Sequence, residues 1–576
     1  MTDWTIETPR EPPLSPEGLT DEHRAIARTV DEFWVRDVAQ YLDAIRAHKP
    51  GVARSVVKKA GELGLTAMQI PEAYGGHDLD LPSVMTAVEH LSTDASYLGW
   101  HFAHSGIGTL PLVFYGTDEQ KRRYLPRLAT VELLGAYALT EPHAGSDARA
   151  ATTRAELSAD GRFYELTGQK MWITNGGDAD LFTVFAQVDG NKLTAFLVER
   201  AFGVVSGAEE HKMGIVGTST TALYFDRVSV PVENVLGEVG QGHLVAFNVL
   251  NFGRLKVGPI AIGGAKKILE VSLAYATNRR AFGAAIATFG AVERMLADAA
   301  VGVYAIESAT WHAVGLIEGD ILARLAGDDA SRSNAELAAF QRHAAECSII
   351  KVAASEMLDD VADIGVQIHG GYGYHRDYFV ERAYRDARIN RIFEGTNEIN
   401  RLVIPSLILK RAAAGGVPLL DAARRQLDAL PALAAASPAP SDEAVVERAR
   451  TITHLMLAAA ERRHGAGLRQ HQEVTMAIAD GMIELFVMTS CLARAQQRVR
   501  QAPDSPAGDM ASVYLCAALA RIASAAETVL ASVMDSGSVV QGLAAVRALS
   551  ARAPLDVIAL RAKIARRLIE ARAFVV

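Results

Sequence analysis

A carboxylate stands between an aromatic residue and a glycine in the run Phe393-Glu394-Gly395-Thr396. Such a glutamate is a candidate base for proton abstraction, because an apolar pocket favours the neutral acid and lifts its pKa toward working pH. The competing interpretation is that Glu394 only decorates a loop ahead of a helix capped by Thr396. This run alone does not decide between the two.

The stretch that ends with this run begins at residue 367 and opens on a glycine-rich turn, Gly370-Gly371-Tyr372-Gly373. Missing Cβ atoms at such a turn let the backbone come close to a flat or anionic ligand. Arginines follow at 382, 385, 388 and 391 and are expected to form structural ion pairs with Glu381 and Asp386 along a helix.

Three further motifs contain residue types that suit a flat cofactor with phosphate groups. YALTEPHAGSD, at 137–147, offers hydroxyls and backbone amides in a glycine–serine turn. MWITNGG, at 171–177, places a tryptophan beside a hydroxyl and a glycine pair, and NRRAFG, at 278–283, places adjacent arginines at a helix end. The respective alternatives are a structural turn, a buried tryptophan of a β domain and a solvated helix terminus.

Several other kinds of site are not supported by the sequence. No GxGxxG follows an expected strand, and HExxH, Walker A and GxSxG motifs are absent. The three cysteines, Cys347, Cys491 and Cys516, form no CxxC, which excludes a disulfide framework and a thiolate zinc site of the usual spacing. A net charge of -9 without a long basic run argues against a nucleic-acid partner.

The elements that must position these motifs follow from the hydrophobic periodicity. With 576 residues, 49% of them hydrophobic and 22% charged, the chain has an ordinary globular composition and room for two to four domains. Apolar residues recur at helical spacing before and after a segment of short alternating runs with turn signals, which indicates an α+β fold. The expected domains are a tail at 1–20, a helical domain at 21–132, a β domain at 133–240, a helical bundle at 241–412, a linker at 413–445 and an additional helical domain at 446–576.

The composition also bears on location. The N-terminus has no apolar core typical of a signal peptide, and no uncharged run is long and apolar enough to cross a bilayer, so a soluble, cytoplasmic protein is expected. Balanced charges around the apolar residues of 420–430 give little attraction to anionic lipid, so peripheral membrane contact is not favoured.

Together the motifs resemble those of the acyl-CoA dehydrogenases. YALTEPHAGSD, KMWITNGG, NRRAFG, QIHGGYGY and RIFEGTNEINR follow the order and approximate spacing of that family over residues 20–412. The additional block, with IADGMIELFVMTSCLARA at 478–495, and the phrase Thr288-Phe289-Gly290 resemble the very-long-chain branch. The resemblance implies that family's fold: an N-terminal helical domain, a middle β-barrel-like domain and a helical bundle, here with an extra C-terminal helical domain.

The resemblance implies an FAD-dependent enzyme that introduces a trans-2,3 double bond into a long-chain acyl-CoA in fatty acid β-oxidation. Glu394 would remove the α-proton while the β-hydrogen leaves as hydride to the flavin, which would sit between the β domain and the helical bundle. The backbone N–H of Glu394 and a ribityl hydroxyl would polarise the thioester carbonyl. Electron transfer flavoprotein is the implied electron acceptor, and a homodimer is the implied assembly.

The resemblance also implies the binding residues. The flavin ring would be lined from the β domain by Tyr137, Ala138, Leu139, Thr140, Ser146, Trp172, Ile173 and Thr174. The adenine–pyrophosphate half would be reached from a second subunit by Arg279, Phe282, Gln367, Ile368, His369, Gly370 and Gly371. The cofactor would be capped beyond the catalytic loop by Thr396, Asn397 and Glu398, and the substrate would be contacted by Ser146, Asn251, Arg254, Gly395 and Gly108.

Two alternatives stay open at this point. The acyl group could be carried on an acyl carrier protein in a biosynthetic pathway, or the chain could be a non-catalytic assembly protein on the same fold. A surface arginine is the competing interpretation of Arg254. Pro111 stands where long-chain members of the family carry a second small residue after Gly108, which leaves the depth of the acyl pocket open.

Overall fold

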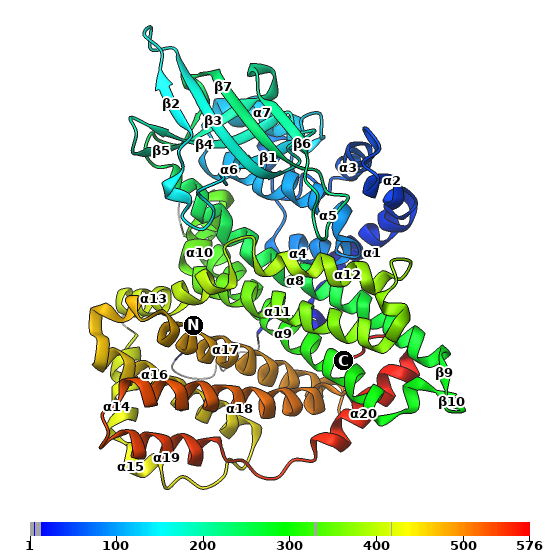
Figure 1. Cartoon of the computed structure of the whole chain (residues 1–576), viewed down its shortest axis with the longest axis vertical. Helices are drawn as coiled ribbons and strands as arrows, with labels where there is room; N and C mark the ends of the chain where they lie inside the picture. Colours follow the sequence, from blue (N-terminus) through cyan, green and yellow to red (C-terminus); the bar gives the residue numbers. More distant parts are fainter. Residues whose placement is uncertain (1–4, 6–12, 328–330, 416) are drawn as a thin grey trace. The chain divides into compact units, whose positions relative to one another are not determined.

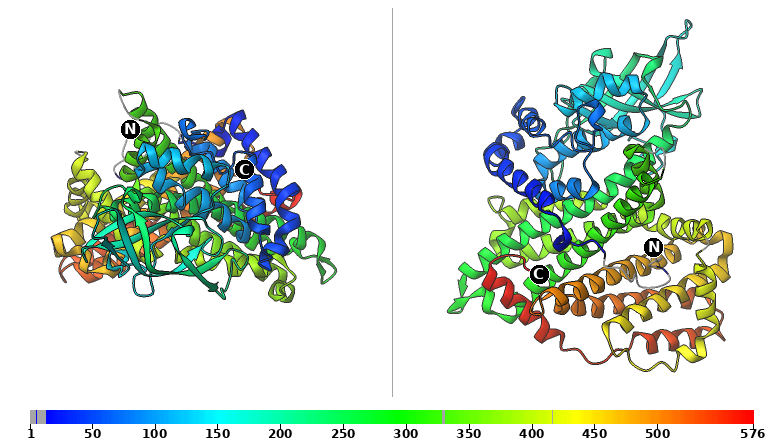
Figure 2. Two further views of the ribbon diagram at one scale, coloured as in Figure 1. Left: turned by 90° about the horizontal axis from the view of Figure 1, so that it is seen from above. Right: turned by 180° about the vertical axis from the view of Figure 1, so that it is seen from behind.

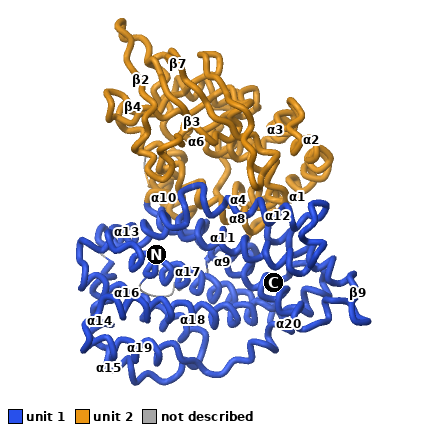
Figure 3. Tube along the Cα trace, viewed as in Figure 1, with its two compact units in different colours: residues 1–18, 264–316, 342–576 blue, residues 19–263, 317–341 orange. Residues whose placement is uncertain are grey.

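The computed structural model describes residues 5, 13–327, 331–415 and 417–576. They divide into two units, shown in Figure 3, and each is described by itself. The sheet unit comprises residues 19–263 and 317–341, and the helical unit comprises residues 1–18, 264–316 and 342–576.

Short helices form the first part of the sheet unit, and polar side chains cap several of them. Thr20, Asp80 and Thr117 accept hydrogen bonds from backbone amides in the first turns that follow them, which satisfies otherwise unpaired N–H groups. The helices are α1 (Asp21–Phe33), α2 (Leu42–Arg46), α3 (Val52–Glu62), α4 (Leu81–Leu91), α5 (Ala95–Phe102), α6 (Leu110–Tyr115) and α7 (Asp118–Ala129).

An eight-stranded sheet follows these helices. Its strands are β1 (Gly135–Ala138), β2 (Arg154–Leu157), β3 (Phe163–Thr174), β4 (Leu181–Val188), β5 (Lys192–Glu199), β6 (Val205–Glu209), β7 (Thr220–Pro231) and β8 (Val235–Leu236). The order is β6-β7-β3-β2-β4-β5-β8, and β1 pairs with β4 in parallel. The hairpins predicted at 159–161 and 189–191 are confirmed as β2–β3 and β4–β5.

One face of this sheet is buried by a cluster that includes Leu166, Phe182 and Phe196. Helices α8 (Gly242–Asn278) and α10 (Arg332–Arg342) complete the described helices that lie wholly or partly in the sheet unit, together with the last turns of α9 (Gly290–Leu325). An apolar helix that is buried on most faces shows little amphipathic pattern, which fits the composition of α8 and α9.

The helical unit is built around α9 and α11 (Ala344–His369), with α12 (Phe379–Ala387) and α13 (Asn397–Ala414) packed on α11. A two-stranded ribbon of β9 (Arg280–Ala281) and β10 (Ala284–Ala285) lies between α8 and α9 in the chain. The middle region of the chain is therefore a sheet between two helical segments, and the predicted α+β class is confirmed.

The C-terminal part of the helical unit, called the tail here, comprises α14 (Leu419–Asp428), α15 (Leu430–Leu433), α16 (Asp442–His464), α17 (Gln472–Gln501), α18 (Ala507–Val533), α19 (Val539–Ser550) and α20 (Val557–Ala571). Helices α16, α17 and α18 pack side by side, as Figure 1 and the right view of Figure 2 show. Part of the segment expected as a linker, 413–445, forms the helix α14. This helix buries Leu419, Ala423 and Leu427.

The tail also contains long apolar helices that include charged residues, which the expectation about uncharged runs did not cover. Helices α17 and α18 are each long and apolar enough to cross a bilayer, by length and composition, and α13 with α14 passes the same test as a bent pair. Of the most apolar 18-residue window, 72% is buried inside the structure in α17 and 44% in α18. A helix that packs against several others is apolar on most of its faces, so an interior helix can have the hydropathy of a membrane span.

A buried ion cluster attaches α17 to the rest of the helical unit. Arg494 of α17 donates to Glu17 at 2.7 Å and lies 2.7 Å from Glu307 of α9. Lys266 pairs with the same Glu307. Burial raises the pKa of Glu307, but the charges of Lys266 and Arg494 outweigh burial and hold the pKa below its ordinary value. Charged side chains that are largely removed from water thus link α17 to the rest of the helical unit.

Candidate active site

The loop that carries Glu394 lies between the 3₁₀ turn Arg388–Arg391 and helix α13. Glu394 has a φ of 58° and Gly395 a φ of 80°, so two consecutive residues adopt the left-handed conformation. This conformation costs a residue with a side chain about 1 kcal/mol, whereas glycine adopts it freely. Such strain is concentrated at functional sites, which makes the backbone of Glu394 a point of interest.

Asn400 holds this loop from the first turn of α13. Its buried side-chain amide donates to the carbonyl oxygens of Glu394 at 3.4 Å, Gly395 at 2.9 Å and Thr396 at 3.0 Å. The Thr396 hydroxyl caps α13 by accepting from the backbone N–H of Ile399 at 3.2 Å. One amide and one hydroxyl therefore fix the backbone on which the glutamate is mounted.

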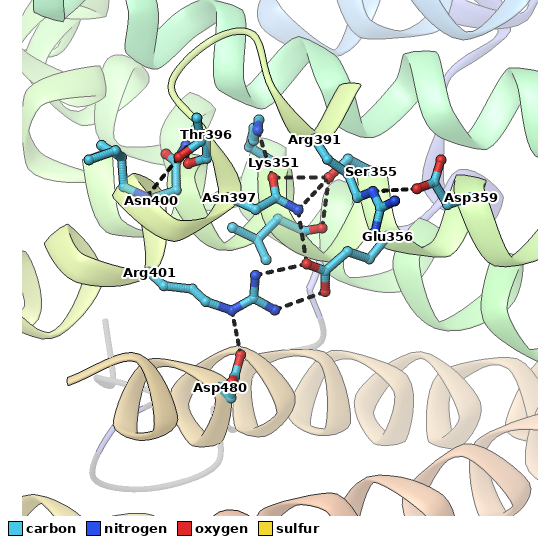
Figure 4. A network of polar contacts seen from close by, with 12 residues as sticks. Lys351, Ser355, Glu356, Asp359, Arg391, Thr396, Asn397, Asn400, Arg401 and Asp480 are labelled. Atoms are coloured by element: carbon cyan, nitrogen blue, oxygen red, sulfur yellow. Dashed lines mark hydrogen bonds and ion pairs between the residues drawn. The ribbon is translucent and has the colours of Figure 1, made fainter. Parts of the chain in front are cut away.

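Asn397 anchors the start of α13 to α11, as Figure 4 shows. Its Oδ1 accepts from Lys351 Nζ at 2.6 Å, and its Nδ2 donates to Ser355 Oγ at 3.1 Å and to Glu356 Oε1 at 2.9 Å. Lys351, Ser355 and Asn397 are buried. The three α11 residues are not among those predicted from the sequence. Their signal is a set of polar residues one helical turn apart inside an otherwise apolar helix.

Two motifs expected at the far end of the cofactor meet in the helical unit. The guanidinium of Arg279 lies 5.6 Å from the centre of the Tyr372 ring, so the NRRAFG turn contacts the Gly370–Tyr374 turn. Phe282 extends from the first of these turns and is 97% exposed. An exposed arginine and an exposed ring side by side suit a ligand with both a phosphate and a flat base.

The predicted set at 367–371 divides between surface and interior. Gln367, Gly370 and Gly371 are exposed, and a Cβ on either glycine would meet nothing within 4 Å. Ile368 and His369 are buried, and the His369 ring stacks on Tyr275 with ring centres 4.2 Å apart. Burial lowers the pKa of His369, which keeps the imidazole neutral. Glu398 is exposed on α13, where hydrogen bonds from backbone amides hold its pKa below the ordinary value.

In the sheet unit, a buried ion pair joins the end of β1 to β3. Lys170 Nζ lies 2.6 Å from Glu141 Oε1 and donates to the Leu139 carbonyl at 3.2 Å. Glu141 also accepts from the backbone N–H groups of Thr152 and Thr153. The pair fixes the strand end that carries Leu139 and Thr140. The sequence analysis quoted Glu141 and Lys170 within its motifs but gave them no role.

The same pair shifts both pKa values. Burial raises the pKa of Glu141, but the charge and hydrogen bonds of Lys170 outweigh it and hold the pKa at about 2. Burial lowers the pKa of Lys170 to about 8, against the attraction of Glu141. The carboxylate is therefore ionised at neutral pH and holds the ammonium in place.

Trp172 projects from an irregular point of β3. The register of β3 and β7 shifts between Lys170 and Ile173, and Trp172 has a φ of 57°. Its side chain is 60% exposed, which excludes the interpretation as a buried core tryptophan, while Ile173 is buried. Thr174 is half-buried next to it.

The other predicted flavin residues of the sheet unit lie on or after β1. Tyr137, Ala138 and Leu139 are buried, Thr140 is half-buried and Ser146 is exposed. The backbone N–H of Met171 donates to the Thr140 carbonyl at 3.0 Å, which places the two flavin-expected motifs side by side. This contact comes from strand pairing that the sequence pattern predicted only in outline.

Besides Ser146, the residues predicted to contact substrate in the sheet unit lie on α8 and at Gly108. On α8, Arg254 Nη1 donates to Asn251 Oδ1 at 3.1 Å, so the asparagine orients the arginine. Gly108 follows the π-helical turn Ala103–Ile107 and packs on β1, where a Cβ would lie 2.8 Å from the Gly135 carbonyl carbon. Close backbone packing alone therefore requires a glycine at 108.

Two separate sets of these residues, one in each unit, suit different parts of a flat cofactor with a pyrophosphate. Trp172 and Phe282 expose large apolar rings that a ligand would cover, and each stands near a polar partner, Thr174 in one case and Arg279 in the other. Rings of this kind pack on a flat aromatic system, while a guanidinium pairs with phosphate. The described residues contain no group of three or more His, Cys, Asp or Glu side chains that could hold a metal ion.

Comparison with known proteins gives matches over most of the chain. Family models described as the N-terminal, middle and C-terminal domains of acyl-CoA dehydrogenase match residues 20–132, 136–228 and 240–409, and a further model with the last description matches 448–548. A probable acyl-CoA dehydrogenase of Bacillus subtilis is 41% identical over 570 residues, covering 98% of this chain and 96% of that protein.

Two further matches bear on the cofactor and on the branch of the family. The crystal structure of an acyl-CoA dehydrogenase complexed with FAD from Bacillus anthracis has a TM-score of 0.95 and 39% identity, covering 98% of this chain and 97% of that one. The human mitochondrial very long-chain specific acyl-CoA dehydrogenase is 35% identical over 477 residues, covering 76% of this chain and 69% of that protein.

Proposed function

Because the chain belongs to the acyl-CoA dehydrogenase family, whose members are FAD-dependent oxidoreductases, we propose that it desaturates a long-chain acyl-CoA with Glu394 as the base. The loop geometry supports this assignment. Glu394 occupies a left-handed backbone position that its own residue type disfavours, and Asn400 holds that backbone in place. A carboxylate fixed in this way can meet a substrate proton in one orientation.

In the proposed reaction the Glu394 carboxylate takes the proton from the α carbon of the thioester. The β-hydrogen leaves with its two electrons, for which FAD would supply the acceptor when bound, and the double bond forms between the two carbons. The backbone N–H of Glu394 donates to the thioester carbonyl and stabilises the negative charge that develops there. Trp172, Thr140 and Thr174 would hold the flavin ring, and Arg279 and Phe282 would reach the pyrophosphate half of the cofactor bound to a second subunit.

The long-chain preference and a role in β-oxidation rest on two supports. The tail matches a family model over 448–548, and the human relative that is 35% identical is a very long-chain specific enzyme. Arg254, oriented by Asn251, is assigned to the CoA arm. We further assign electron transfer flavoprotein as the electron acceptor, a homodimer as the assembly and the cytoplasm as the location.

Glu394→Gln tests the base. The amide keeps the shape of the side chain and removes the base, so flavin reduction by palmitoyl-CoA in anaerobic stopped-flow should slow about 10² to 10⁴-fold. FAD absorbance should be retained. Glu381→Gln is the matched control, because Glu381 pairs with Arg385 on α12, outside the loop, and should reduce at the wild-type rate.

Two results would contradict the proposal. Reduction of Glu394→Gln at the wild-type rate would show that Glu394 is not the base. Reduction of the wild-type flavin by butyryl-CoA but not by palmitoyl-CoA would contradict the long-chain assignment and leave the base untouched.

A further inference from the structure

The anchor of the Glu394 loop continues beyond α11 into the tail. Arg401, one turn after Asn397 on α13, donates to both carboxylate oxygens of Glu356, at 2.7 and 2.9 Å. Glu356 is the residue that also accepts from Asn397. The same guanidinium donates through Nε to Asp480 of α17 at 2.6 Å, as Figure 4 shows.

We propose that Asp480 is a positioning residue for the dehydrogenation base, acting through Arg401, Glu356 and Asn397 on the loop that carries Glu394. This inference rests on the proposed role of Glu394. It gives the tail a part in the reaction, since α17 then holds a guanidinium that orients Glu356, one of the three α11 side chains that bind Asn397.

The geometry explains why one carboxylate in the tail can matter at the loop. The planar guanidinium of Arg401 pairs with Glu356 through two parallel hydrogen bonds. Its Nε donates to Asp480, and this third bond fixes the rotation of the guanidinium. Glu356 in turn shares its Oε1 between Arg401 and Asn397. A rotated Arg401 would draw Glu356 away from Asn397, whose other partners on α11 are Lys351 and Ser355.

The surroundings of the pairs set the size of the effect. A cavity of about 570 Å³ is bordered by Glu356, Arg401 and Asp480, and the side chains of Glu356 and Asp480 are 37% and 45% exposed. Water in such a cavity screens the ion pairs, so their loss should leave the protein folded. The consequence should lie in position, where a shift of about 1 Å at a reacting group costs up to about 10²-fold in rate.

A neighbouring pair on the same helix provides a matched control. Glu484, one turn after Asp480 on α17, binds Arg521 at 2.5 Å and accepts from the Tyr514 hydroxyl at 2.8 Å, both on α18. This pair stays within the tail and borders the same cavity. Glu484→Ala therefore removes an equivalent tail carboxylate without touching the path to Asn397.

The test uses the full-length, FAD-loaded protein and two readouts. Hydrogen–deuterium exchange should become faster in the peptide covering 389–400 in Asp480→Ala and stay unchanged there in Glu484→Ala. Flavin reduction by palmitoyl-CoA should slow roughly tenfold in Asp480→Ala with an unchanged KM, because misplacement affects the reacting group rather than substrate binding. Asp480→Asn, which keeps the acceptor oxygen for Arg401 Nε, should recover most of the rate.

The outcomes separate this inference from the assignment of the base. Unchanged exchange at 389–400 in Asp480→Ala, or an equal increase in Glu484→Ala, overturns the inference whatever the activity. Faster exchange in Asp480→Ala, together with flavin reduction at the wild-type rate in Glu394→Gln, would support the coupling of tail and loop and would overturn Glu394 as the base.

Discussion

Glu394, the proposed base, illustrates at the residue scale how such a position can work against stability. Its φ of 58° lies in a region that glycine adopts without cost. Hydrogen bonds from the Asn400 side chain to the carbonyl oxygens of Glu394 and Gly395 hold the backbone there. The residue type is therefore explained by chemistry and not by local conformational preference.

Glu394→Gly should stabilise the protein while it removes the base. Relief of the left-handed strain should raise the free energy of unfolding by up to about 1 kcal/mol, offset in part by the greater freedom of glycine in the unfolded chain. Thermal denaturation of the apoprotein measures the change. Glu398→Gly, within the first turn of α13, should lower the midpoint instead, because glycine weakens a helix. A lower midpoint for Glu394→Gly than for Glu398→Gly would contradict the strain argument.

At the scale of elements, the Lys170–Glu141 pair fixes β1 against β3 beside the residues assigned to the flavin. Lys170→Met should leave the Glu141 carboxylate buried without its cation, which typically costs about 3–5 kcal/mol. Urea denaturation followed by far-UV circular dichroism measures the loss. Glu165→Gln, which breaks the exposed pair with Arg227 on β3 and β7, should cost less than about 1 kcal/mol. Equal losses in the two variants would show that the buried pair has no special weight.

The acid stability of the sheet unit should depend on the same carboxylate. The pKa of Glu141 is held at about 2 in the fold, below the ordinary 4.5, so the unfolded chain binds this proton more readily. Its contribution is then complete above pH 4.5 and is lost as the pH falls toward 2. The urea midpoint should fall more steeply with acid in the wild type than in Lys170→Met/Glu141→Gln, which lacks both charges. Parallel curves would refute the assignment.

The sequence predicted the sheet between helical segments well, because alternation with a period of two and turn residues are local signals. It also predicted the β4–β5 hairpin at Asp189-Gly190-Asn191 from turn residues alone. The roles of Lys170 and of Lys351 escaped it, since a lysine at either position reads as a surface residue until the fold buries it. Glycine and proline predicted a linker at 413–445, although the apolar residues at 420, 423, 427 and 430 already follow the spacing of the helix α14.

At the scale of the whole molecule, we expect the tail to influence assembly. Light scattering should give two copies of the 61.7 kDa chain, because the proposed assembly is a homodimer. Deleting 441–576 removes the helices that pack on α13 and α11, so their apolar faces should become exposed and cause aggregation or higher assembly. Four copies of the intact chain, or a deleted protein that stays a well-behaved dimer, would contradict this role of the tail.

Two helices that would satisfy the length and hydropathy of a membrane span emerge from the ribosome one after the other, α17 before α18. During synthesis α17 has α16 as an early partner, whereas the face that it shares with α18 stays open until residues 507–533 have been made. Packing within the tail and insertion into a bilayer therefore compete for the same apolar surface while translation proceeds. Slow codons between the two helices, or a fusion placed there, would lengthen the time that α17 spends without α18. The competition would then shift toward the membrane, although the sequence of each helix is unchanged.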